Sequence, residues 1–120
     1  MKKTINILGE RYKLRFKNYS DDPLFAQRHI DGYHDSIDKQ IVVCNMKTYP
    51  SWENETAAYC QKVEKQILRH EIIHAFLTQS GLDDNSNQFE GAWAKNEEMI
   101  DFFALQSPKI VKIFSELDIL

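Results

Sequence analysis

The chain has 120 residues, of which 42% are hydrophobic and 28% are charged. This size and composition predict a single folded domain spanning residues 1–120. Proteins that bind nucleic acid normally carry an excess of Lys and Arg. The formal net charge here is −3, so we expect no nucleic-acid partner.

The amino-terminal segment carries Lys2 and Lys3, but its apolar run ends after Leu8. Such a run is too short for the apolar region of an export signal, and no other run approaches the length of a membrane span. Cys44 and Cys60 lack the CxxC spacing, so we expect two free, buried thiols rather than a disulfide. We therefore expect a cytoplasmic protein with no membrane partner.

Residues 4–45 mostly show the two-residue period of β-strands. Ile5 and Ile7 alternate with polar residues, Gly9-Glu10 provides a turn, and the alternation then resumes, which predicts a β-hairpin. Residues 18–32 are rich in turn-forming residues and could contain a short irregular or helical piece. A second hairpin is predicted over residues 32–45, with its turn at 36–39 and an apolar strand from Gln40 to Asn45.

The period becomes helical at about residue 54, after a loop that contains Pro50. One long helix is predicted from near Glu55 to Gln79, and Ser80-Gly81 is a suitable helix end. A polar surface loop follows.

Two further helices are predicted in the carboxy-terminal part of the chain. The first runs from about Ala92 to Leu105. The second begins with Ser107 as N-cap and Pro108 at the first helical position, and it continues to Leu117. A small N-terminal antiparallel sheet, a long helix and two C-terminal helices make an α+β fold.

The long helix contains the sequence HEIIH, with His70, Glu71 and His74 in the order H-E-x-x-H. Residues four apart lie on one helix face, so the two imidazoles can take two corners of a zinc tetrahedron. Glu71 is offset by one residue, where its carboxylate can accept a proton from an attacking water. The alternative is a core helix in which the two histidines are simply hydrogen-bonded polar residues.

A third ligand is needed to favour zinc over that alternative. No histidine follows His74, but the segment NEEMID supplies Glu97 as a carboxylate ligand. Asp101 lies one helical turn further on, where it could accept a hydrogen bond from a ligating histidine. The alternative here is a solvated acidic helix face. It is opposed by the apolar neighbours of Asp101, because a buried carboxylate without a partner is costly.

These residues resemble the gluzincin pattern HExxH followed by NExxxD, which thermolysin-like peptidases carry. The layout is also similar to small ImmA/IrrE-type and prophage-encoded metallopeptidases of Gram-positive bacteria, particularly in LRHEIIHAFLTQSGL and WAKNEEMIDFFALQSPKI. Two departures are clear. Ile73 stands where ImmA/IrrE-type proteins have glycine, and the chain lacks the large C-terminal domain of thermolysin.

The resemblance implies a zincin-like fold with His70, His74 and Glu97 as Zn²⁺ ligands, Glu71 as catalytic base and Asp101 as support for a ligand histidine. It implies an endopeptidase that hydrolyses a specific protein substrate, such as a phage or mobile-element regulator. In zincins a strand near the active-site helix binds extended substrate, and the strand from Gln40 to Asn45 is slightly favoured for this role over that of an interior strand.

Oxyanion stabilisation remains open, and the polar residues considered for it are Tyr33, His34, Tyr59 and Arg69. His29 is a less favoured alternative metal ligand. Two rival functions also remain: a non-catalytic zinc-binding module that mediates protein interactions, and a metal-free helical protein that binds a partner.

Overall fold

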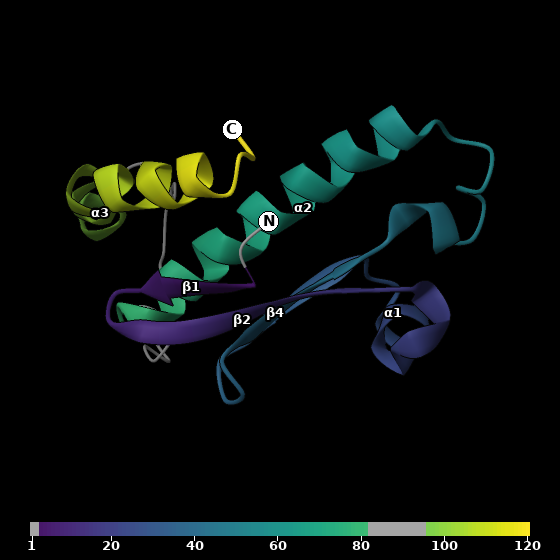
Figure 1. Cartoon of the computed structure of the whole chain (residues 1–120). Helices are drawn as coiled ribbons and strands as arrows, with labels where there is room; N and C mark the ends of the chain where they lie inside the picture. Colours follow the sequence, from purple (N-terminus) through teal and green to yellow (C-terminus); the bar gives the residue numbers. More distant parts are fainter. Residues whose placement is uncertain (1–2, 82–95) are drawn as a thin grey trace.

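The protein, represented by a computed structural model, is described here for residues 3–81 and 96–120, except for the side chains of residues 100 and 104. A four-stranded sheet lies against the long helix α2, Ala57–Gln79 (Figure 1). The mixed α+β composition predicted from the sequence is therefore confirmed. Among the described helices, none combines the length and the apolar character that a membrane crossing requires.

The sheet consists of β1 (Thr4–Ile7), β2 (Glu10–Lys17), β3 (Gly32–Asp35) and β4 (Gln40–Cys44), in the spatial order β1-β2-β4-β3. The β1–β2 and β3–β4 pairs are the two predicted antiparallel hairpins. The sheet taken as a whole is mixed and not antiparallel as predicted, because β2 and β4 pair in parallel. The chain crosses from β2 to the far edge, forms β3 there, and returns as β4 beside β2.

The strand order also decides which strand is at the edge. β4 lies between β2 and β3, and Ile41, Val42 and Val43 are almost completely buried. The favoured edge role for residues 40–45 was therefore wrong, and the interior alternative was right. The sheet edges are β1 and β3, and both contact α2, β3 more extensively than β1.

The segment between β2 and β3 contains a 3-10 turn, η1 (Tyr19–Asp21), and the short helix α1 (Pro23–Arg28). The side chain of Asp22 caps α1 by accepting a hydrogen bond from the backbone N–H of Leu24. A second 3-10 turn, η2 (Met46–Thr48), leads from β4 towards α2. Figure 1 shows α1 at one end of the sheet, on the side opposite α2.

The long helix begins two residues later than predicted and ends at the predicted residue. Thr56 is the N-cap, and its hydroxyl accepts a hydrogen bond from the backbone N–H of Tyr59. At the other end Gly81 adopts a φ of 85°, a conformation that ends helices and suits glycine. The side chains that α2 buries against the core form adjacent pairs four residues apart in its second half, with one further residue near its start: Cys60, Ile67, Leu68, Glu71, Ile72, Ala75 and Phe76.

The carboxy-terminal part forms one helix, α3 (Glu97–Glu116), rather than the two predicted. Pro108 lies inside this helix, although a proline there removes a backbone hydrogen bond. Phe102, Ile110 and Phe114 are buried along its length, and this packing outweighs the local break. The predicted start at residue 92 lies outside the described residues. α3 contacts α2 and lies on the same side of the sheet in Figure 1.

Candidate metal centre

The central feature of α2 is a convergent pair of imidazoles. His70 and His74 lie one turn apart, and their Nε2 atoms are 3.0 Å apart. The ligand atoms of His70, Glu71 and His74 all lie within 4.8 Å of one another. Both histidines are exposed, whereas Glu71 is buried, so the group lies at the boundary between the core and the solvent.

The geometry of the two imidazoles fits a zinc ion. Two nitrogen ligands, each about 2.0–2.1 Å from a tetrahedral zinc, are separated by about 3.4 Å. The separation of 3.0 Å between the His70 and His74 nitrogens is close to this value, and small ring rotations would reach it. In the absence of a metal, the same approach is an N–H···N hydrogen bond between a donating and an accepting ring. Zinc commonly uses two imidazoles and a carboxylate, and the two imidazoles of such a set are brought together here.

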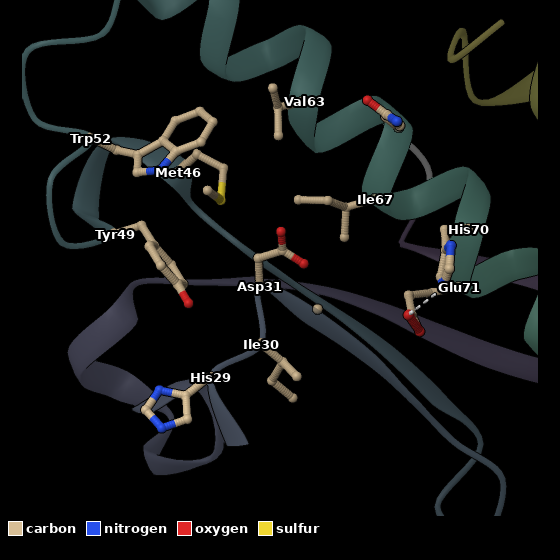
Figure 2. A pocket seen from close by; sticks show the side chains of 12 residues that line it. His29, Ile30, Asp31, Met46, Tyr49, Trp52, Val63, Ile67, His70 and Glu71 are labelled. Atoms are coloured by element: carbon tan, nitrogen blue, oxygen red, sulfur yellow. Dashed lines mark ion pairs between the residues drawn. The ribbon is translucent and has the colours of Figure 1, made fainter. Parts of the chain in front are cut away.

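Glu71 is a charged residue buried among the apolar side chains between α2 and the sheet. Its side chain faces β3, where the Cβ of an alanine at Gly32 would lie 3.8 Å from Glu71 Cγ. Glu71 is 8% exposed, and in the described part of the chain its carboxylate makes no hydrogen bond. The imidazole of His70 can pair with this carboxylate when it is protonated, and its Nε2 atom lies 3.9 Å from Glu71 Oε1 (Figure 2).

This environment raises the pKa of Glu71 above its ordinary value. Burial is the main cause, and the negative charge of Asp31 acts in the same direction, while a positive charge on His70 opposes both. A buried acid with a raised pKa beside two imidazoles is an arrangement typical of catalytic bases.

A cavity of about 500 Å³ adjoins His70 and Glu71. Its wall on the α2 side is formed by one helix stripe that ends at His70 and Glu71. The opposite wall comes from the chain before β3 and from the loop after β4, which includes Tyr49 and Trp52 (Figure 2). The volume is in the range of pockets that bind small ligands or side chains.

The structure does not bring the other predicted zinc residues into this group. Glu97 is the first residue of α3 and is exposed, and Asp101, one turn later, is also exposed. Neither belongs to the group formed by His70, Glu71 and His74. Asn96 caps α3, so Glu97 and Glu98 lie in the first turn, where the helix dipole favours acidic residues. Their roles as ligand and support remain predictions.

All four residues considered for oxyanion stabilisation already have other partners. The hydroxyl of Tyr33 donates a hydrogen bond to Asp22, and Arg69 donates one to the backbone carbonyl of Ile119. Tyr59 stacks on Trp52. Tyr59 also precedes His70 by three turns of α2, which corresponds to about 16 Å.

The fourth residue, His34, lies on the edge strand β3 two residues after Gly32, so both face α2. Its Nε2 atom lies 3.2 Å from the hydroxyl of Tyr12. His29, the alternative ligand, lies at the cavity and outside the histidine–glutamate group.

Sequence reasoning missed the contribution of Asp31 and Gly32 to the site. A Cβ at Gly32 would come within 2.5 Å of Ile67 Cγ2, so the missing side chain lets α2 approach the sheet closely. Asp31 lines the cavity. The dipeptide Asp31-Gly32 indicates a turn or strand start by itself, and nothing local in it indicates proximity to Glu71.

Comparison of the chain with protein-family models, with curated proteins and with solved structures finds no match. The site is therefore characterised by its own geometry: two convergent imidazoles, a buried carboxylate and an adjoining cavity.

Proposed function

We propose that the chain is a small cytoplasmic zinc-dependent endopeptidase of the gluzincin type, acting on a specific protein such as a phage or mobile-element regulator. The observation that carries this proposal is the approach of His70 Nε2 and His74 Nε2 to 3.0 Å beside the buried Glu71. The cavity next to Glu71 provides space for a peptide side chain at the same place.

His70 and His74 would hold the zinc, with Glu97 as the third ligand and Asp101 as support for a ligand histidine. Bound zinc would supply a Lewis acid that polarises a peptide carbonyl and lowers the pKa of a water. In this arrangement Glu71 would serve as the base that takes a proton from the attacking water and as the acid that delivers it to the leaving nitrogen when the C–N bond breaks.

The position of β3 supports a peptide substrate. β3 is an edge strand, and its first residue, Gly32, lies against Glu71. An extended peptide that adds to a sheet edge is held by backbone hydrogen bonds, which fix its direction without regard to sequence. A peptide added to β3 would pass along α2 near Glu71, so β3 takes the substrate-binding role that the sequence had favoured for residues 40–45.

Zinc analysis of the purified protein tests the metal centre. The wild type should contain about one zinc per chain, as expected for one three-ligand site, and His70→Ala and His74→Ala should each lose it. Absence of zinc after reconstitution would contradict the proposal. Glu97→Ala should weaken zinc binding more than Glu98→Ala, its neighbour in the same helix turn, and equal effects would exclude Glu97 as a ligand.

Cleavage is tested with a proteome-derived peptide library. The zinc-loaded wild type should cut members of the library, and Glu71→Gln should not. If the protein binds zinc through His70 and His74 but cuts neither the library nor co-expressed proteins, the non-catalytic zinc-binding module becomes the better account.

A further inference from the structure

The cavity beside Glu71 has a distinctive combination of walls and charge. Apolar and polar surface contribute about equally to its walls, and the apolar part comes from Ile30, Met46, Tyr49, Trp52, Val63 and Ile67. Among the described residues that line it, Asp31 and Glu71 are carboxylates, His29 and His70 are imidazoles, and none is Lys or Arg. Figure 2 shows the Asp31 carboxylate directed into this space, between Tyr49 on one side and Ile67 on the other.

Asp31 has no partner of its own in the described part of the chain. Its backbone carbonyl accepts a hydrogen bond from the N–H of Cys44, which holds the residue at the entry to β3. Its side-chain carboxylate makes no hydrogen bond or ion pair with any described residue, in contrast to Asp22 and Asp35, which both accept hydrogen bonds. An unpaired carboxylate in a cavity that is lined in part by apolar side chains attracts a cation that can pair with it.

We infer that this cavity is a specificity subsite that binds a lysine or arginine side chain of the peptide substrate, with Asp31 pairing with its charged end. The apolar walls suit the aliphatic stem of such a side chain, which buries its methylene groups while its charged end meets a polar partner. This inference deepens the proposed function and rests on it, because Glu71 at one end of the cavity places the bound side chain beside the scissile bond.

A free peptide amino terminus presents the same ammonium chemistry. It has no aliphatic stem, however, and would leave the apolar part of a cavity of about 500 Å³ unfilled. The side chain is therefore the occupant that matches both the charge of Asp31 and the apolar walls.

Binding of amino-acid amides to the zinc-loaded protein tests the inference without requiring catalysis. Trp52 lines the cavity, and a Trp93→Phe background leaves it as the sole tryptophan, so its fluorescence reports occupancy. Nα-acetyl-arginine amide should bind about tenfold more tightly than Nα-acetyl-citrulline amide, which has nearly the same shape without the charge. Asp31→Asn should abolish this difference and leave the affinity for Nα-acetyl-norleucine amide unchanged, which shows that the cavity is intact.

The inference would be overturned by equal affinities for the arginine and citrulline amides, by an Asp31→Asn variant that keeps the preference, or by no binding of the arginine amide. Norleucine amide with a free α-amino group tests whether a peptide amino terminus can occupy the cavity instead. If it binds as tightly as Nα-acetyl-arginine amide, the occupant is a peptide amino terminus and the side-chain assignment is wrong.

Peptide libraries fixed at one position separate this result from the proposed function. Cleavage that favours Lys or Arg at one position, with the preference lost in Asp31→Asn, supports both. Cleavage without such a preference contradicts the subsite alone. Arginine binding that depends on Asp31, in a zinc-loaded protein that cleaves nothing, contradicts the proposed peptidase alone.

Discussion

Asp22 and Glu71 are both buried carboxylates, 4% and 8% exposed, but their surroundings differ. Asp22 accepts hydrogen bonds from the hydroxyl of Tyr33 at 2.6 Å, the backbone N–H of Leu24 at 3.1 Å and the ammonium of Lys17 at 3.3 Å. Glu71 accepts none in the described part of the chain, and the imidazole of His70 lies 3.9 Å away.

The pKa values of the two carboxylates are therefore shifted in opposite directions. Burial raises the pKa of Asp22, but the hydrogen bonds and the charge of Lys17 outweigh burial and hold its pKa below the ordinary value. Burial also raises the pKa of Glu71, and there the charge of His70 is not enough to reverse it. A carboxylate whose burial is offset by partners stabilises the fold, whereas one left uncompensated beside a cavity is available for chemistry.

The largest expected effect is that of Glu71→Gln on peptide cleavage. Removing the proposed general base should lower the cleavage rate by about 100- to 10,000-fold. The free energy of unfolding should stay the same or rise, because a neutral amide is less costly to bury than an unpaired carboxylate. Cleavage assays, zinc analysis and urea unfolding measure the three quantities. A destabilised Glu71→Gln protein would mean that Glu71 is a structural residue like Asp22.

Gly32→Ala tests the close approach of β3 to α2 that places Glu71. The added Cβ would lie 2.5 Å from Ile67 Cγ2, a distance that forces a shift in a packed interface. We expect the free energy of unfolding to fall by up to about 3 kcal/mol. Ile67→Ala removes the clashing group, so the double variant should be more stable than the sum of the two single changes predicts. If the changes in the free energy of unfolding of the two single variants, measured in urea, add up to that of the double variant, this contact is contradicted.

Asp22→Asn should act on stability alone. The amide keeps one acceptor oxygen but loses the charge, so we expect a loss of about 1–2 kcal/mol in the free energy of unfolding. Cleavage per folded molecule should be unchanged. The neighbouring Asp21 is exposed, and Asp21→Asn provides the matched control with little expected effect. Loss of cleavage in folded Asp22→Asn protein would show that Asp22, at the start of α1, contributes to the site.

The pH dependence of stability tests the hydrogen-bonded Asp22 carboxylate more specifically, with a smaller expected change in the free energy of unfolding. Because the folded-state pKa of Asp22 lies below its ordinary value of 3.8, its stabilising contribution is fully present above that value. The contribution is lost as the pH falls through the lower folded-state pKa, when the carboxylate becomes protonated. Urea unfolding at a series of acidic pH values should show a shallower loss of stability in Asp22→Asn. Identical slopes would contradict the hydrogen-bonded carboxylate.

The last prediction concerns the buried thiol of Cys44, which is neutral when protonated and is far from the comparison of the two carboxylates. Both cysteines are free and buried, as predicted, and burial raises the pKa of Cys44 from 9.0 to about 11. This shift alone lowers the thiolate fraction about 100-fold. A thiol reagent at mildly alkaline pH should therefore react with Cys44 only after the protein is unfolded in urea. Rapid labelling of the native protein, located by mass spectrometry, would contradict this burial.

The sequence by itself determined the features that depend on neighbours along the chain. The four-residue spacing of His70 and His74 defines their shared face on any α-helix, and the predicted end of α2 at Gln79 matched the structure. The two hairpins followed from alternation and turn residues. These features could be predicted because helix period, capping and turn formation act within a few residues.

Tertiary structure alone decided how distant segments meet. The parallel pairing of β2 with β4 and the interior place of β4 depend on where the chain returns after α1, which no local pattern states. The continuity of α3 through Pro108 depends on core packing that outweighs a local break. The approach of Gly32 to Glu71, and with it the place of Asp31 in the same cavity as His70 and Glu71, arises because α2 and the sheet bury their apolar faces against each other.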